Sequence, residues 1–178
     1  VAEYRTLRTK YTGTMAYDLS ENGLIAMGAA ALGANRADNA LAWLNLNLEF
    51  YPKSSRTYQA IAQVQQRKND KDAAIKALEK AVELDPDYAQ AWGALAETEQ
   101  LLPAYTGEDI EPARARAEVA AQRALGIDPD TASALVAMAN VHVLRSEWAQ
   151  AEKAFRRALS LAPGDAEAVN QYAQFQTT

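Results

Sequence analysis

Apolar and small residues recur along most of the chain in phase with four prolines. The prolines are Pro52, Pro86, Pro129 and Pro163; the first and last intervals between them are equal, and the middle interval is longer. They close four similar phrases, LNLEFYP, KAVELDP, RALGIDP and RALSLAP, and an alanine precedes each of them at one fixed distance. Because four segments share one phase, the chain is predicted to repeat one structural unit.

The pattern within each segment predicts two helices. Apolar residues return every three or four positions, as on one face of a helix, and each proline ends the second helix because the residue before a proline avoids the helical region. We expect helices near 21–33, 37–50, 55–67, 71–83, 88–102, 112–126, 132–145, 149–161 and 165–176.

These segments resemble the tetratricopeptide repeat, a helix-turn-helix unit of about 34 residues. Residues 132–165 match it best, with Ala139, Ala151, Phe155, Ala158 and Pro163 at the expected positions. The resemblance implies an all-α fold, a right-handed α-solenoid of about four units and a C-terminal capping helix. The expected domains are 1–20 (N-terminal segment), 21–54, 55–88, 89–131 and 132–165 (four repeats), and 166–178 (capping helix and tail).

Two parts of the chain do not follow the repeat. In residues 1–20, Tyr4, Leu7 and Tyr11 would form an apolar stripe on a helix over 2–11, which we expect to dock on the first repeat, as a cap or partly in its groove. The third repeat carries nine extra residues. Pro103 and the stretch TGED are predicted to form a loop at 103–111, and Pro112 a helix start.

Composition adds that the helices pack closely. The chain has 39 alanines among 178 residues but only three Phe and three Trp. Alanine is the best helix former and buries little area. Gly23, Gly28 and Gly33 are therefore interpreted as close helix contacts, and Trp92 and Trp148 as packing residues. For Trp43 two alternatives stay open, contact with the N-terminal segment or an exposed contact surface.

Few residues could carry catalytic or metal chemistry. With no cysteine and one histidine, the chain cannot form a Cys/His zinc site or a disulfide, and it lacks a Cys nucleophile. His142 replaces an aromatic core residue and is interpreted as a packing residue. No GxSxG, GxGxxG or calcium-loop spacing occurs. We therefore expect no enzymatic activity, no metal and no cofactor.

In this family the first helix of each unit lines a concave groove. The carboxylate clamp that holds chaperone C-termini in some arrays is missing, because Ile25, Ala29 and Ala60 stand where it needs polar side chains. The centre of the predicted groove is instead rich in amides, which offer donors and acceptors to a peptide backbone. The candidate groove residues are Arg56, Gln59, Gln63, Arg67, Gln90, Glu97, Asn140 and Asn170.

These features predict a non-catalytic scaffold that binds a peptide segment of a partner protein. The alternative is a regulatory or dimerising tail of a larger bacterial enzyme or signalling protein. Residues 89–176, with EWAQAEKAFRRALSLAP, are similar to repeat regions of bacterial multidomain signalling proteins, and residues 21–88 to repeat tails of some serine hydrolases.

Charge and hydropathy narrow the expected partners. The net charge of −5 argues against nucleic acid as a partner, and no apolar stretch is long enough to insert into a membrane. We expect a monomer or a homodimer. A cytoplasmic location is slightly favoured over a periplasmic one, and the chain, which opens on Val1, is interpreted as a processed product or a piece of a longer protein.

Overall fold

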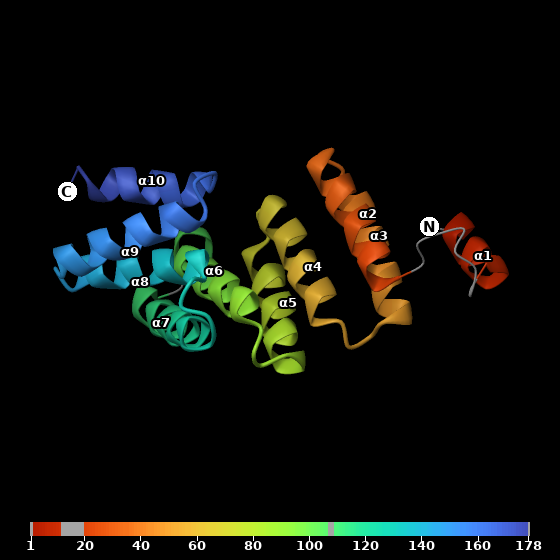
Figure 1. The fold of residues 1–178 in the computed structure, drawn as a ribbon, viewed down its shortest axis with the longest axis horizontal. Coiled ribbons are helices and arrows are strands. Elements are labelled where there is room, and N and C mark those ends of the chain that lie inside the picture. Colours follow the sequence, from red (N-terminus) through yellow and green to blue (C-terminus); the bar gives the residue numbers. More distant parts are fainter. Residues whose placement is uncertain (1, 12–19, 107–108, 178) are drawn as a thin grey trace. The chain divides into compact units, whose positions relative to one another are not determined.

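The computed structural model describes residues 2–11, 20–106 and 109–177, and every regular element in these ranges is a helix. Figure 1 shows the helices in chain order. They are α1 (Ala2–Tyr11), α2 (Glu21–Gly33), α3 (Ala37–Phe50), α4 (Ser55–Arg67), α5 (Lys71–Leu84), α6 (Ala89–Thr106), α7 (Ile110–Ile127), α8 (Ala132–Leu144), α9 (Trp148–Leu161) and α10 (Ala166–Phe175). The predicted all-α fold is confirmed.

The helix bounds follow the prediction closely, with one correction in the third repeat. We expected a loop from Pro103, but α6 continues through it to Thr106. A proline inside a helix removes one backbone hydrogen bond and its ring crowds the carbonyl four residues earlier, and α6 includes Pro103 in spite of this local cost. Helix α7 begins at Ile110, two residues before the predicted start, so that Pro112 lies in its first turn.

Three turns between paired helices share one backbone conformation. Asn35, Asn69 and Ser146 each lie two residues beyond the end of the first helix and have positive φ values of 58°, 62° and 59°. Asparagine tolerates the left-handed region better than most residues because its side chain bonds locally. The same turn thus reverses the chain after α2, α4 and α8.

The chain divides into two compact units, residues 1–84 and 85–178. In the first, α2 pairs with α3 and α4 with α5, and α3 and α4 contact each other. Its core contains Leu24, Leu44 and Leu46, each at most 1% exposed. Gly28 lies against Leu44 so closely that an added Cβ would stand 2.9 Å from that side chain.

Among the described side chains of helix α1, Tyr4 and Arg5 contact helix α3. Tyr4 is 7% exposed and meets Trp43 of α3 edge-to-face, with 5.8 Å between the ring centroids. Arg5 pairs with Glu49 of α3 at 2.5 Å. These contacts select the first alternative for Trp43. The side chains of Leu7 and Tyr11, also expected in the stripe, are outside the described residues.

The second unit contains the pairs α6/α7 and α8/α9, and α10 packs on α8 and α9. Alanines at the helix crossings are fully buried, among them Ala117, Ala139 and Ala151. Phe155 fills the space beside them, with its ring centroid 5.7 Å from that of Tyr172 and 5.5 Å from that of Phe175. This cluster fixes α10 against the last helix pair.

Buried polar groups connect helices within each unit. In the first, the Asn47 amide donates to the hydroxyl of Thr57 at 2.8 Å and to the carbonyl of Glu21 at 3.2 Å. In the second, the buried Glu99 of α6 accepts from Arg116 of α7 at 2.8 Å. Asn47 stands where the repeat pattern has alanine, and its amide hydrogen bonds tie α3 to α2 and α4.

Candidate binding groove

Amide side chains from three helices join in one hydrogen-bonded row in the second unit. Asn140 of α8 donates through its Nδ2 to the Oε1 of Gln100 on α6 at 3.0 Å and to the Oε1 of Gln171 on α10 at 2.6 Å. Gln100 donates to the carbonyl of Ala137 at 2.8 Å, and Gln171 to the carboxylate of Glu167 at 2.7 Å. The row thus spans the first helices of two successive pairs and the capping helix.

The row lies in a cavity of about 490 Å³. Most of the lining residues come from α6, α8 and α10, the helices predicted to line the groove. They are Gln100, Leu101, Arg114, Asn140, Val141, Val143, Leu144, Phe155, Glu167, Gln171, Gln174 and Phe175. The hollow is therefore a groove between inner helices.

The amide row keeps hydrogen-bonding capacity for a bound molecule. Both protons of the Asn140 amide are used within the row, and the described part of the chain supplies no donor to its Oδ1. Gln100 and Gln171 each use one of two amide protons. The groove therefore presents one acceptor and two donors on neighbouring helices.

One end of the groove is apolar. Leu144 is 52% exposed at the end of α8, and Phe175 at the end of α10 stacks on Trp148 with 6.3 Å between centroids. We expected Trp148 to be a packing residue, but it is 48% exposed. Trp148 is the first residue of α9, and its ring stacks on Phe175 while about half of the side chain stays exposed.

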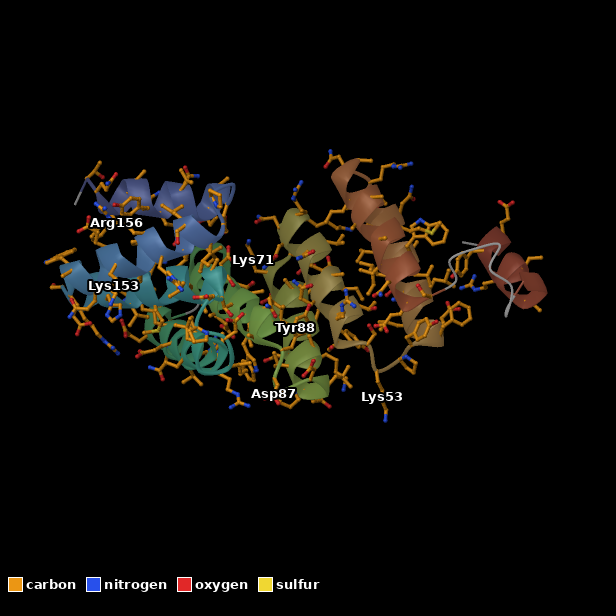
Figure 2. All side chains as sticks on the ribbon, in the orientation of Figure 1. Lys53, Lys71, Asp87, Tyr88, Lys153 and Arg156 are labelled. Atoms are coloured by element: carbon orange, nitrogen blue, oxygen red, sulfur yellow. The ribbon has the colours of Figure 1, made fainter. Side chains whose placement is uncertain are left out.

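Two of the lining residues carry charge. Arg114 pairs with Glu111 at 2.9 Å, whereas Glu167 has no cationic partner among the described residues. Lys153 and Arg156 are exposed on α9 and are not among the lining residues (Figure 2). The uncompensated charge in this groove is therefore negative.

The remaining predicted groove residues divide between the two units. In the first unit, Arg56 of α4 donates to the Oδ1 of Asn22 on α2 at 2.8 Å, which joins two first helices. On the same helix, Gln59 is half-buried, and Gln63 and Arg67 are exposed.

In the second unit, Gln90 is exposed on α6 and Glu97 half-buried. Asn140 occupies the middle of the amide row, whereas the exposed Asn170 does not line the cavity. Its neighbour Gln171, which we did not predict, lines the cavity instead. The spacing of Glu167, Gln171 and Phe175, four residues apart, is the sequence signal that identifies this face of α10.

The other candidates for chemistry have structural roles. His142 contacts Glu147 at 2.5 Å across the turn between α8 and α9 and is half-buried. Gly28 makes the predicted close contact, but an added Cβ at Gly33 would meet nothing within 4 Å. In the described ranges no three His, Asp or Glu side chains gather as a metal site, and none of the helices is long and apolar enough to cross a membrane.

Family models of the tetratricopeptide repeat match two stretches, residues 55–88 and 132–175. The chain contains tetratricopeptide repeats. The second match begins with the fourth predicted repeat and includes α10, so that the capping helix belongs to the repeat pattern. No curated protein matches the chain in sequence.

Several solved structures are similar in fold. A thermophilic TPR protein of Thermus thermophilus is 20% identical, with a TM-score of 0.69 over 88% of this chain and 90% of that one. PilF of Pseudomonas aeruginosa is 19% identical, with a TM-score of 0.66 over 87% and 67% of the two chains. The MamA protein is 21% identical, with a TM-score of 0.62 over 87% and 80%. At these identities the similarity shows the fold alone.

Proposed function

We propose that this protein is a non-catalytic scaffold that binds an extended peptide segment of a partner protein in its groove. Tetratricopeptide repeats are protein-interaction modules, and stacked repeats create long concave binding surfaces. The observation that carries the proposal is the amide row of Gln100, Asn140 and Gln171, which lines the cavity.

The chemistry of the row suits a peptide backbone. Each residue of an extended segment offers one N–H donor and one C=O acceptor. The Oδ1 of Asn140 would accept from such a segment, and the amides of Gln100 and Gln171 would donate to it. Because the row is bonded within itself, its side chains are already ordered before binding, which reduces the entropy lost on docking.

The groove residues predicted in the first unit extend the proposal to a second stretch of partner. Arg56, held by Asn22, would meet a carboxylate, and Gln63 and Arg67 are exposed on the same helix.

A peptide selection tests the proposal. Binders are selected from a random library displayed on phage, with the whole chain immobilised, and their affinities are measured by fluorescence anisotropy. The double variant Asn140→Ala/Gln171→Ala should weaken binding at least about tenfold, because it removes several hydrogen bonds worth about 1 kcal/mol each. Arg56→Ala/Gln63→Ala tests the first unit in the same way.

The matched control is Gln122→Ala/Gln150→Ala, which removes two exposed amides on α7 and α9 outside the cavity. It should bind the selected peptides as wild type does. If every variant keeps wild-type affinity, the binding surface lies elsewhere and the proposal fails. Circular dichroism confirms that each variant is folded.

A further inference from the structure

The groove of the second unit has an acidic side and an apolar side, separated by the amide row. On α10 the residues Glu167, Gln171 and Phe175 follow one another at intervals of four and line the cavity together. Residues four apart lie on one helix face and are separated by roughly 6 Å along the axis. This single helix therefore presents a carboxylate, an amide and an aromatic ring in a line.

Helix α8 also presents an amide followed by an apolar side chain. Leu144 follows Asn140 by four residues, and both line the cavity. The stacking of Phe175 on Trp148, which opens α9 just after α8, shows that the ends of α8 and α10 lie on the same side of the groove. Leu144 and Phe175 therefore form a second, apolar row beside the amides.

The exposure of this apolar row indicates a ligand with apolar side chains. Leu144 is 52% exposed and lines the cavity together with the amide row, and Trp148, on which Phe175 stacks, is 48% exposed. The side chains of an extended segment point alternately to opposite edges, about 3.3 Å apart along the chain. With its backbone on the amide row, every second side chain would face Leu144 and Phe175, and the others would face the side of Glu167.

The charge of Glu167 determines which side chains of the ligand are favoured on the edge that faces it. Glu167 accepts from Gln171 and has no cationic partner among the described residues, while Arg114 is already paired with Glu111. The exposed basic side chains Lys153 and Arg156 lie on α9 and do not line the cavity (Figure 2). A basic side chain of the ligand would supply the missing partner, and the net charge of −5 favours the approach of a basic segment.

We propose that this groove takes an extended partner segment in which apolar side chains alternate with basic ones. The apolar edge contacts Leu144 and Phe175, and a lysine or arginine pairs with Glu167. This inference rests on the proposed function, because it names the class of peptide that the same groove binds.

Three synthetic peptides of equal length test the alternation and the charge. The first alternates leucine and lysine, the second alternates leucine and glutamate, and the third has the composition of the first with all leucines before all lysines. Binding to the whole chain is measured by fluorescence anisotropy at physiological ionic strength. The first peptide should bind at least about tenfold more tightly than either of the others, because only it matches both rows.

Variants of the protein distinguish a local ion pair at Glu167 from the general attraction of a basic peptide to an acidic protein. Glu167→Gln should weaken the first peptide about fivefold and leave the second unchanged or slightly improved. The matched control Glu152→Gln removes the same charge on α9, outside the cavity, and should have no effect. Leu144→Ala should weaken the first peptide, and because Leu144 is half exposed the variant should remain folded.

The outcomes distinguish this inference from the proposed function. If the glutamate peptide or the block peptide binds as well as the first, or if Glu152→Gln acts like Glu167→Gln, the inference is overturned while peptide binding stands. If none of these peptides binds but library-selected peptides lose affinity in Asn140→Ala/Gln171→Ala, the inference alone fails. If those selected peptides are also insensitive, both fail.

Discussion

Small side chains at the helix crossings allow neighbouring backbones to approach in both units. The four alanines that precede the repeat prolines at one fixed distance, at positions 40, 74, 117 and 151, all have an exposed fraction of 0%. These positions were predicted from spacing alone. Their burial means that a larger side chain at such a crossing has no space, whereas an exposed alanine such as Ala149 of α9 can be enlarged.

Ala139→Leu and Ala151→Leu should each destabilise the second unit by about 1–3 kcal/mol through overpacking. Ala149→Leu, two residues from Ala151 on the exposed face of α9, should change stability by less than about 0.5 kcal/mol. Urea unfolding followed by circular dichroism measures the three differences. Equal effects at all three positions would contradict the assigned repeat phase.

The glycines of α2 give a second matched comparison. At Gly28 an added Cβ would stand 2.9 Å from the side chain of Leu44, which is itself 1% exposed and cannot move freely. Gly28→Ala should therefore lower the thermal midpoint, by about 1 kcal/mol or more in free energy. Gly33→Ala meets open space and should stabilise by about 0.5 kcal/mol, because alanine restricts the unfolded chain. A destabilising Gly33→Ala would show that the end of α2 is strained.

At the scale of the element, helix bounds could be predicted because the positions of the prolines, the buried alanines and the recurring apolar residues indicate the same bounds in each repeat. The end of α6 could not, because Pro103 removes a backbone hydrogen bond and crowds the preceding turn, which predicts a helix end, whereas α6 continues to Thr106. On α10 the repeat pattern predicted Asn170 as a groove residue, but Gln171 lines the cavity and Asn170 does not. A terminal helix has a neighbour on one side only, so that its rotation is set by the aromatic contacts of Tyr172 and Phe175 and not by the repeat spacing.

The contact between α1 and α3 should depend on pH. Hydrogen bonding and attraction by the Arg5 guanidinium lower the pKa of Glu49 below its ordinary value in the folded chain. A lowered carboxylate pKa contributes stability that is fully present above the ordinary Glu value and is lost as pH falls through the lowered one. Glu49→Gln should therefore reduce the thermal midpoint near pH 7, and the difference from wild type should vanish in acid.

The matched control for this pH dependence is Glu79→Gln, an exposed carboxylate on α5 for which no ion pair is described. It should leave the midpoint unchanged at both pH values. High salt should also shrink the effect of Glu49→Gln, because the Arg5–Glu49 pair is about half exposed and is screened by mobile ions. A difference between Glu49→Gln and wild type that persists below the titration range would show that Glu49 acts through packing and not through charge.

At the scale of the whole molecule, the division at residues 84 and 85 indicates how the chain unfolds. Each unit has its own helix pairs and its own buried side chains, centred on Leu24 and Leu44 in one and on Phe155 in the other. In repeat proteins each repeat contacts only the repeats next to it, so that the free energy of unfolding is nearly a sum of local terms. A single cooperative transition over all 178 residues is therefore not expected.

Separate expression of residues 1–84 and 85–178 tests this expectation. Both fragments should be helical, and the sum of their circular dichroism spectra should reproduce the spectrum of the whole chain. Urea unfolding of the whole chain should be broad or stepwise, with a slope below that of a single cooperative domain of its size, because each step exposes only part of the buried surface. Ala139→Leu should shift the transition of 85–178 and leave that of 1–84 unchanged. One sharp transition, together with fragments that are unfolded alone, would show instead that the two units fold as one.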